Sequence, residues 1–153
     1  MSEFIFDNLK VSHSKQVFIL QKKYKKEFGN NIWKTEELKR SIENNALVGN
    51  VFIVDKVVMG FCFFKKIDNY LEIYSLFVDP LYRKKGIAAN FVGLCIKYCQ
   101  KNMLKKIILD VNEKNIRAIN FYKKSNFTFC GKRKDYYKVN NSFDDSFTMN
   151  LIL

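Results

Sequence analysis

The first third of the chain alternates a short apolar run with two helical patterns. Residues 4–9, FIFDNL, are rich in aromatic and branched side chains, which predicts a strand. Residues 11–28 then place apolar side chains at helical spacing, and Gly29 is a favourable residue just past a helix end. A second helix is predicted to follow, with Thr35 as its N-cap and Leu38 in its apolar stripe.

The next segment, residues 46–78, has the pattern of strands. It contains three runs of β-branched and aromatic residues, ALVGNVFIV, VVMGFCFFKK and LEIYSLFV. The runs are separated by the turn-type pairs Asp55-Lys56 and Asp68-Asn69. Short turns between strands predict an antiparallel meander.

Beyond residue 78 the hydrophobic period changes again. Apolar residues recur at helical spacing from about Lys85 to Lys101, and the strand-like run KKIILDV covers 105–111. The order strand, helix, strand indicates a parallel crossover. A helix over 116–124 and two strands, FTFCGKRKDYYKV and SFTMNLIL, complete the chain. The whole order predicts a mixed α/β fold.

Composition bounds the kind of protein. With 153 residues, 48% of them hydrophobic, and no linker or repeat, residues 1–153 are expected to form a single domain. The sequence contains no window of about 20 uninterrupted apolar residues, so we expect no membrane-spanning helix. The N-terminus has no basic leader followed by an apolar core, so we expect a cytoplasmic protein.

Charge and cysteines narrow the chemistry only slightly. The formal net charge of +12 favours phosphates, nucleic acid or acidic partners, but lysine and asparagine are abundant throughout, which indicates a compositional bias. The four cysteines and one histidine do not have the spacing of a zinc site. We therefore expect no metal, and four reduced cysteines in the core.

Three consecutive basic residues precede the predicted start of a helix. Residues 78–91 read VDPLYRKKGIAANF, so Arg83, Lys84 and Lys85 come just before Gly86 and an apolar helical run. Unpaired N–H groups and the helix dipole favour anions at such a place, and a glycine lets the backbone approach them closely. This segment is predicted to bind a polyphosphate.

Two motifs resemble those of the GNAT acetyltransferases. In that family the phosphate-binding pattern is Gln or Arg, two variable residues, Gly, a variable residue, then Gly or Ala, which residues 83–88 fit. The stretch LDVNEKNIRAINFYKKSNF is similar to the family's second signature, through Asn115, Ala118-Ile119, Tyr122 and Asn126-Phe127, with Asn126 in place of the usual glycine. The resemblance covers roughly residues 46–153. It implies the GNAT fold, with about seven strands and four helices, and an acetyl-CoA-dependent N-acetyltransferase.

The resemblance also implies a set of cofactor-binding residues. The loop would bind the diphosphate of coenzyme A, and the preceding strand would pair with the pantetheine arm and direct N–H groups at the developing oxyanion. The expected residues are Leu76, Phe77, Val78, Arg83, Lys84, Lys85, Gly86, Ile87, Ala88, Ala89 and Asn115.

Two residues are candidates for proton transfer. Asp110 aligns with the position of the family's catalytic glutamate, and it is either the base, directly or through a water, or a structural residue. The alternative bases are Glu72 and a backbone carbonyl with an ordered water. Tyr122 has a phenol whose ordinary pKa, about 10, is above that of a thiol, so it can return a proton to the leaving sulfur. A covalent cysteine route is disfavoured, because no cysteine has a recognisable base near it in the sequence.

Within the superfamily, the chain is most similar to the ribosomal-protein alanine N-acetyltransferases of bacteria. The segments NIWKTEEL and DYYKVNNSFDDSFTMNL carry this looser resemblance. It implies that the acceptor is the N-terminal amine of a small-subunit ribosomal protein, held by Tyr136 and Tyr137, which would otherwise be ordinary strand aromatics. The alternatives are a small-molecule amine, such as a polyamine or an antibiotic, and a basic nucleic-acid-binding module. The protein is expected to be a monomer or a homodimer.

Overall fold

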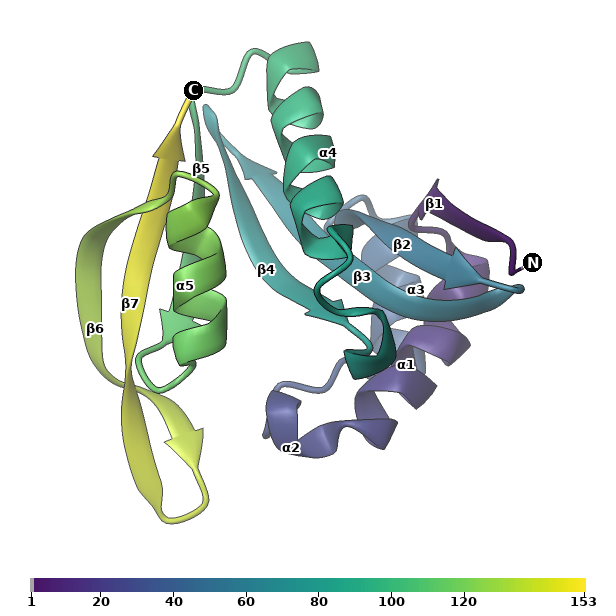
Figure 1. Cartoon of the computed structure of the whole chain (residues 1–153), viewed down its shortest axis with the longest axis horizontal. Helices are drawn as coiled ribbons and strands as arrows, with labels where there is room; N and C mark the ends of the chain where they lie inside the picture. The colour runs from purple at the N-terminus through teal and green to yellow at the C-terminus, as the bar shows by residue number, and fades with distance from the viewer. Residues whose placement is uncertain (1) are drawn as a thin grey trace. The chain divides into compact units, whose positions relative to one another are not determined.

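The computed structural model describes residues 2–153 and contains a seven-stranded mixed sheet with strand order β1-β2-β3-β4-β5-β7-β6 (Figure 1). The strands are β1 (Phe4–Asn8), β2 (Val48–Val54), β3 (Val57–Ile67), β4 (Tyr70–Val78), β5 (Lys106–Asn112), β6 (Thr128–Val139) and β7 (Ser142–Ile152). The helices are α1 (Ser14–Lys23), the short α2 (Lys25–Phe28), α3 (Thr35–Glu43), α4 (Ile87–Lys101) and α5 (Ile116–Lys124), with 3-10 turns η1 (Val11–His13) and η2 (Pro80–Tyr82). The predicted α/β class and its seven strands are confirmed. Within residues 2–153, none of these helices is long and apolar enough to cross a membrane.

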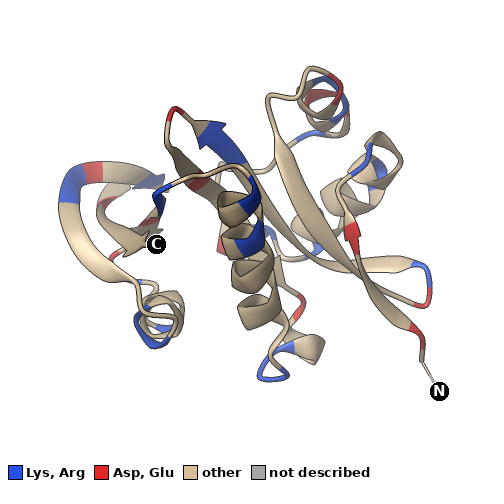
Figure 2. Ribbon diagram, turned by 90° about the horizontal axis from the view of Figure 1, so that it is seen from above, with Lys and Arg blue, Asp and Glu red and all other residues tan. Residues whose placement is uncertain are grey.

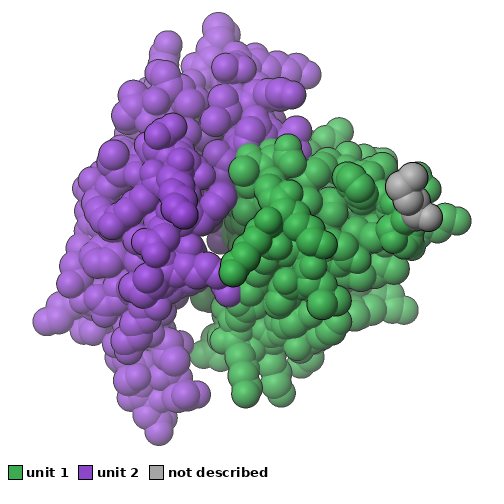
Figure 3. All heavy atoms as spheres, viewed as in Figure 1, with its two compact units in different colours: residues 1–65, 75–91 green, residues 66–74, 92–153 purple. Residues whose placement is uncertain are grey.

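The chain divides into two compact units (Figure 3). The first contains the residues up to 65 together with 75–91, and the second contains 66–74 and 92–153. Elements β3, β4 and α4 continue from one unit into the other. The expected single domain over 1–153 stays a prediction.

The core of the first unit lies between helices and the N-terminal strands. Helices α1 and α3 pack on one face of β2 and β3 (Figure 1), where Val17, Leu20 and Leu38 contact a cluster that includes Phe61 and Phe63. The rings of Phe61 and Phe63 are stacked with centroids 4.5 Å apart. Such aromatic burial supplies much of the hydrophobic stabilisation of this unit.

The first predicted helix is interrupted in the structure. Residues 11–28 form η1, α1 and α2, and the break falls at Tyr24, whose φ of −115° and ψ of 36° are not helical. Tyr24 donates a hydrogen bond to Asp79 and packs against Phe77, so tertiary contacts override the helical pattern. Gly29 ends α2 with a φ of +56°, as predicted.

Local turn chemistry explains most remaining boundaries. The pair Asp55 and Lys56 has φ values of 48° and 70°, and Asp68 has 48°, so the turns lie where the sequence predicted them. The N-cap of α3 is Lys34 rather than the expected Thr35, which is instead its first helical residue. Strand β7 begins at Ser142, earlier than the predicted residue 146.

The second unit is built around β5. Its residues Lys106–Leu109 pair in parallel with Tyr70–Ile73 of β4, and its other edge pairs antiparallel with β7. Burial alternates along β5, with Ile107, Leu109 and Val111 buried and Asp110 on the opposite face. Helix α5 lies along β5 and β7 (Figure 1).

The cysteines are reduced, but not all of them are in the core. Cys62, Cys95 and Cys99 are buried thiols outside any disulfide, and burial raises the pKa of Cys99 to about 11. Cys130 is exposed, because nearly every residue of β6, a strand at the edge of the sheet, is exposed. The prediction was therefore wrong for Cys130.

Positive charge is spread over the elements. Figure 2 shows Lys and Arg on helices, turns and strands alike, with Asp and Glu between them. This distribution agrees with a compositional bias rather than a patch built on one element.

Candidate functional site

The predicted site residues fall in both units. The phosphate loop, residues 83–89, belongs to the first unit. Lys84 and Gly86 both have a left-handed backbone, with φ values of 61° and 81°. Backbone alternation of this kind turns successive N–H groups into an anion-binding nest. This backbone conformation is suited to an anion, and the binding of a phosphate by the loop stays a prediction.

The start of α4 leaves backbone donors unused. Asn90 donates its N–H to Gly86 O at 3.0 Å, which closes the first turn. For the N–H groups of Ile87, Ala88 and Ala89, residues 2–153 provide no hydrogen-bond acceptor. Lys84 and Lys85 are exposed beside them. These N–H groups lie at the N-terminus of α4, a helix of 15 residues. Together with the two lysines, they favour the binding of an anion at this place.

The backbone conformation at position 86 favours glycine, and the lack of a side chain leaves open space beside the loop. A side chain at this position would be strained, because L-residues rarely adopt a φ of +81°. A Cβ built there meets no atom within 4 Å, so the surface next to the glycine is open. A ligand can therefore approach the backbone closely at this point.

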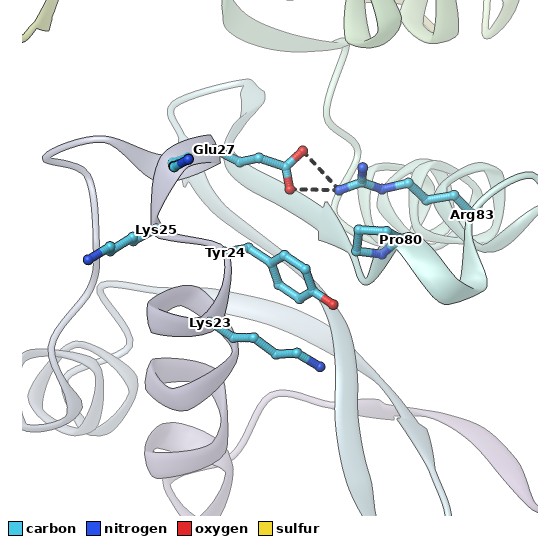
Figure 4. A pocket seen from close by; sticks show the side chains of 7 residues that line it. Lys23, Tyr24, Lys25, Glu27, Pro80 and Arg83 are labelled. Atoms are coloured by element: carbon cyan, nitrogen blue, oxygen red, sulfur yellow. Dashed lines mark hydrogen bonds and ion pairs between the residues drawn. The ribbon is translucent and has the colours of Figure 1, made fainter.

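Arg83 differs from the two lysines because its side chain is engaged within the protein. Its Nε donates to Val78 O at 2.8 Å. Its Nη2 donates to both carboxylate oxygens of Glu27, at 3.1 and 2.9 Å, as Figure 4 shows. A surface cavity of about 330 Å³ lies beside this pair, lined by Lys23, Tyr24, Lys25, Lys26, Glu27, Pro80 and Arg83.

The strand residues predicted to meet the pantetheine arm are largely covered. Phe77 is 6% exposed and Val78 5%, and Leu76 is half-buried. The ring of Phe77 packs against Tyr24 and Phe28. Only backbone groups of this segment are therefore suited to a ligand, and their cofactor contacts stay a prediction.

In the second unit, Asp110 is held by two neighbours. Thr148 Oγ1 donates to Asp110 Oδ1 at 2.6 Å, and Arg133 Nε lies 3.7 Å from the same oxygen. The Asp110 side chain is 11% exposed. Residues 2–153 provide no partner for its other oxygen, Oδ2. This oxygen is available to take a proton from an amine or from a water.

The negative charge of Asp110 disfavours ionisation of the Tyr137 phenol. Burial raises the pKa of Tyr137 to about 12. A hydrogen bond with Ser146 partly opposes this increase, and the charge of Asp110 adds to it. A register shift between Arg133 and Tyr137 on β6 sets the direction of this side chain. The neighbouring Tyr136 is 48% exposed, and the two rings meet edge to face. The predicted base therefore influences one predicted acceptor-binding residue electrostatically.

The residues of the second signature lie along α5 and at its two ends. Asn115 caps this helix by accepting a hydrogen bond from the Ala118 N–H at 3.2 Å, so it has a structural task besides its predicted cofactor contact. Tyr122 is 8% exposed and packs against Phe121 and Phe127. Asn126 has a φ of +69°, and asparagine tolerates this conformation, which explains how it replaces the family's glycine.

Sequence reasoning missed the partners of the candidate residues. Thr148 and Arg133 lie on strands whose register with β5 no local pattern reveals. The alternation of Phe147 and Met149 on β7 does place Thr148 on the other face of its strand. The partner of Arg83, Glu27, is 56 positions away and has no motif.

Metal ligands do not gather in the described part of the chain. Among residues 2–153, no group of three His, Cys, Asp or Glu side chains could hold a metal ion.

Comparison with known proteins places the chain in a family. A family model described as "Acetyltransferase (GNAT) family" matches residues 16–127, which span the phosphate loop, Asp110 and Tyr122. The chain therefore belongs to the GNAT acetyltransferases, a family that uses acetyl-CoA. The resemblance of the two sequence motifs is confirmed at this level.

Individual relatives agree with this assignment. An uncharacterized N-acetyltransferase of Methanocaldococcus jannaschii is 38% identical over 56 residues, a match that covers 37% of this chain and 25% of that protein. The ribosomal-protein-S18-alanine N-acetyltransferase of Escherichia coli has a similar structure, with a TM-score of 0.81, 16% identity, and coverage of 98% of this chain and 94% of that one.

Two further solved structures differ in what their names describe. NAA60 of Arabidopsis thaliana, in complex with a bisubstrate analogue, has a TM-score of 0.83 at 18% identity, with 98% of each chain covered. A spermidine N-acetyltransferase chimera from Vibrio cholerae and hSSAT has a TM-score of 0.82 at 20% identity, covering 97% of this chain and 95% of that one. At such identities these likenesses show the fold, which serves more than one kind of acceptor.

Proposed function

We propose that this chain transfers an acetyl group from acetyl-CoA to the N-terminal α-amine of a protein, with a small-subunit ribosomal protein as the candidate acceptor. The observation that carries the proposal is the geometry of Asp110 in the second unit: Thr148 holds its Oδ1 at 2.6 Å, and residues 2–153 provide no partner for its Oδ2. Family membership supports acetyl-CoA as the donor. Location in the cytoplasm and the state of assembly, monomer or homodimer, stay predictions.

The residues that would hold the donor fit a diphosphate. Acetyl-CoA supplies an activated thioester and a diphosphate by which it can be bound. The free N–H groups of Ile87, Ala88 and Ala89 would donate to this diphosphate, and Lys84 and Lys85 would balance its charge. The open space at Gly86 removes a steric barrier to this contact.

Two proton movements are assigned to the second unit. Asp110 Oδ2 would take a proton from the acceptor amine, directly or through a water, while Thr148 fixes the carboxylate through its other oxygen. Tyr122 would give a proton to the departing sulfur, and its burial among aromatic rings holds the phenol in one orientation. In this scheme the amine attacks directly, without a covalent enzyme intermediate.

The proposed acceptor class follows from the ordinary pKa of the amine. The ordinary pKa of an α-amine is about 8, some two units below that of lysine, so a single carboxylate can release it at neutral pH. The exposed ring of Tyr136 and the half-buried ring of Tyr137 offer an amphipathic wall for the first peptide side chain. Both tyrosines therefore stay proposed acceptor contacts.

The proposal is tested with a panel of acceptors. The protein is incubated with acetyl-CoA and with peptides that have free N-termini, N-terminally blocked lysine peptides, and polyamines, and the products are read by mass spectrometry. We expect acetylation of the free N-termini. Acetylation of the polyamines alone would assign the small-amine activity instead.

The nucleic-acid alternative predicts a different response to salt. Binding to nucleic acid weakens steeply as salt rises, because counterions are released from the phosphates. Protection of the fold against heat by acetyl-CoA should survive moderate salt. A melting temperature raised by RNA, but not by acetyl-CoA, would support the binding module.

A further inference from the structure

We infer that the segment α1–α2 positions the phosphate loop, and that Arg83 acts as a positioning residue rather than as a side-chain ligand of the phosphates. This inference rests on the proposed binding of coenzyme A at the loop. All the residues that carry it lie in the first unit.

Two polar interactions connect the segment α1–α2 to the residues at and before the phosphate loop. Tyr24, at the junction of α1 and α2, donates to Asp79 Oδ2 at 2.9 Å. Asp79 is fully buried, and its other oxygen accepts the Leu81 N–H at 2.9 Å, which fixes the start of η2. Glu27 of α2 forms the second interaction, the ion pair with Arg83.

The side chain of Arg83 is held on three sides. Its Nε bonds Val78 O at the end of β4, its Nη2 bonds Glu27, and its guanidinium carbon lies 5.3 Å from the centre of the Phe77 ring. The side chain is only 20% exposed. A planar group held by a carbonyl, a carboxylate and an aromatic face has a defined orientation, which points it at α2 (Figure 4).

Arg83 therefore connects three elements at the first residue of the loop. Its backbone is extended, with φ −70° and ψ 161°, and the next residue, Lys84, is left-handed. The position of Arg83 thus sets where the left-handed turn begins. If Glu27 is lost, the loop should move more freely, and its N–H groups should be less well prepared for the diphosphate.

The test uses Glu27→Gln, because the two possible roles of Arg83 predict opposite effects. If Arg83 positions the loop, Glu27→Gln weakens coenzyme A binding about tenfold, and Arg83→Met weakens it similarly. The double variant should then bind no more weakly than the weaker single variant. If Arg83 is instead a phosphate ligand, removing the competing carboxylate should leave the affinity unchanged or improve it, and this outcome would overturn the inference.

Glu36→Gln is the matched control. It removes the same charge from an exposed glutamate on α3 that pairs with Lys39, and it should leave coenzyme A affinity unchanged within about twofold. Calorimetry measures the affinities, and the melting temperature confirms that each variant is folded.

Hydrogen exchange without any ligand separates this inference from the proposed function. Glu27→Gln should speed the exchange of the bonded amides of Leu81, Tyr82 and Asn90, and Glu36→Gln should not. Unchanged exchange at these amides would overturn the positioning role. Faster exchange in a protein that never binds coenzyme A would support the positioning role and refute the proposed function.

Discussion

Thr148 donates a hydrogen bond of 2.6 Å to Asp110 across the β5–β7 pairing, and it bonds only one of the two carboxylate oxygens. Arg133 approaches the same oxygen. The arrangement separates two tasks within one carboxylate, since Oδ1 fixes the side chain and Oδ2 remains available for a proton.

Replacing Asp110 by Asn should lower turnover roughly 100-fold or more, because the amide cannot accept the proton of the amine. The affinity for acetyl-CoA, measured by calorimetry, should change little. Thr148→Val serves as the comparison, since it keeps the carboxylate and removes only its orienting bond, and we expect a smaller loss. Full turnover in Asp110→Asn would make the residue structural.

Tyr122→Phe removes only a hydroxyl from a buried ring. We expect turnover to fall about tenfold or more, with little loss of cofactor binding, because the leaving sulfur loses its proton donor. Tyr98→Phe on α4 provides a control for the loss of a tyrosine hydroxyl elsewhere. Steady-state rates at saturating acetyl-CoA give the result, and an unaltered rate in Tyr122→Phe would remove this residue from the mechanism.

Gly86→Val should abolish cofactor binding while the protein stays folded. The φ of +81° strains any side chain, and the new methyl groups would occupy the space in which we place the diphosphate. Gly93→Ala is the control, because this glycine lies inside α4 with open space around it. It should bind normally and be more stable by about 1 kcal/mol. Normal affinity in Gly86→Val would refute the loop assignment.

His13 should make stability depend on pH. Burial lowers the pKa of this imidazole, an effect that Asp7 partly opposes, and Nδ1 accepts the Lys10 N–H at 3.0 Å, so the folded state favours the neutral ring. The unfolded chain takes up a proton first as the pH falls through the ordinary value of 6.5. The contribution of His13 is therefore fully present above that value and is lost below it.

Thermal melts of the native protein and of His13→Gln test this prediction. The native protein should have its largest advantage at about pH 8, and this advantage should shrink as the pH is lowered towards about 5. An advantage that grows on acidification would contradict the assigned sign.

Local signals in the sequence predicted most of the fold. Turn pairs such as Asp55-Lys56 and the helix end at Gly29 are decided by neighbouring residues, so their positions were correct. The break at Tyr24 was not predictable, because its cause is the buried Asp79, 55 positions away. Exposure of Cys130 depends on β6 being an edge strand, which is a property of the sheet order.

In the candidate site, too, local features were predictable from the sequence, whereas contacts between distant residues were not. The loop at Gly86 directly precedes α4, as its local motif predicted, whereas the capping of α5 by Asn115 was not predicted, because the motif indicated only a cofactor contact. The ties from Thr148 to Asp110 and from Glu27 to Arg83 depend on strand register and helix placement. Such contacts decide what a motif residue can do, but they leave no pattern in the sequence.

The central claim is tested most directly by one competition reaction. The protein receives acetyl-CoA and a single peptide that begins with a free alanine and contains an internal lysine, together with an equal amount of spermidine. Fragmentation in the mass spectrometer then locates the acetyl group. The account predicts acetyl on the α-amine of the alanine, and a yield lower by roughly 100-fold or more when Asp110→Asn replaces the native protein. Acetyl on spermidine or on the lysine side chain, with the α-amine unmodified, would contradict it.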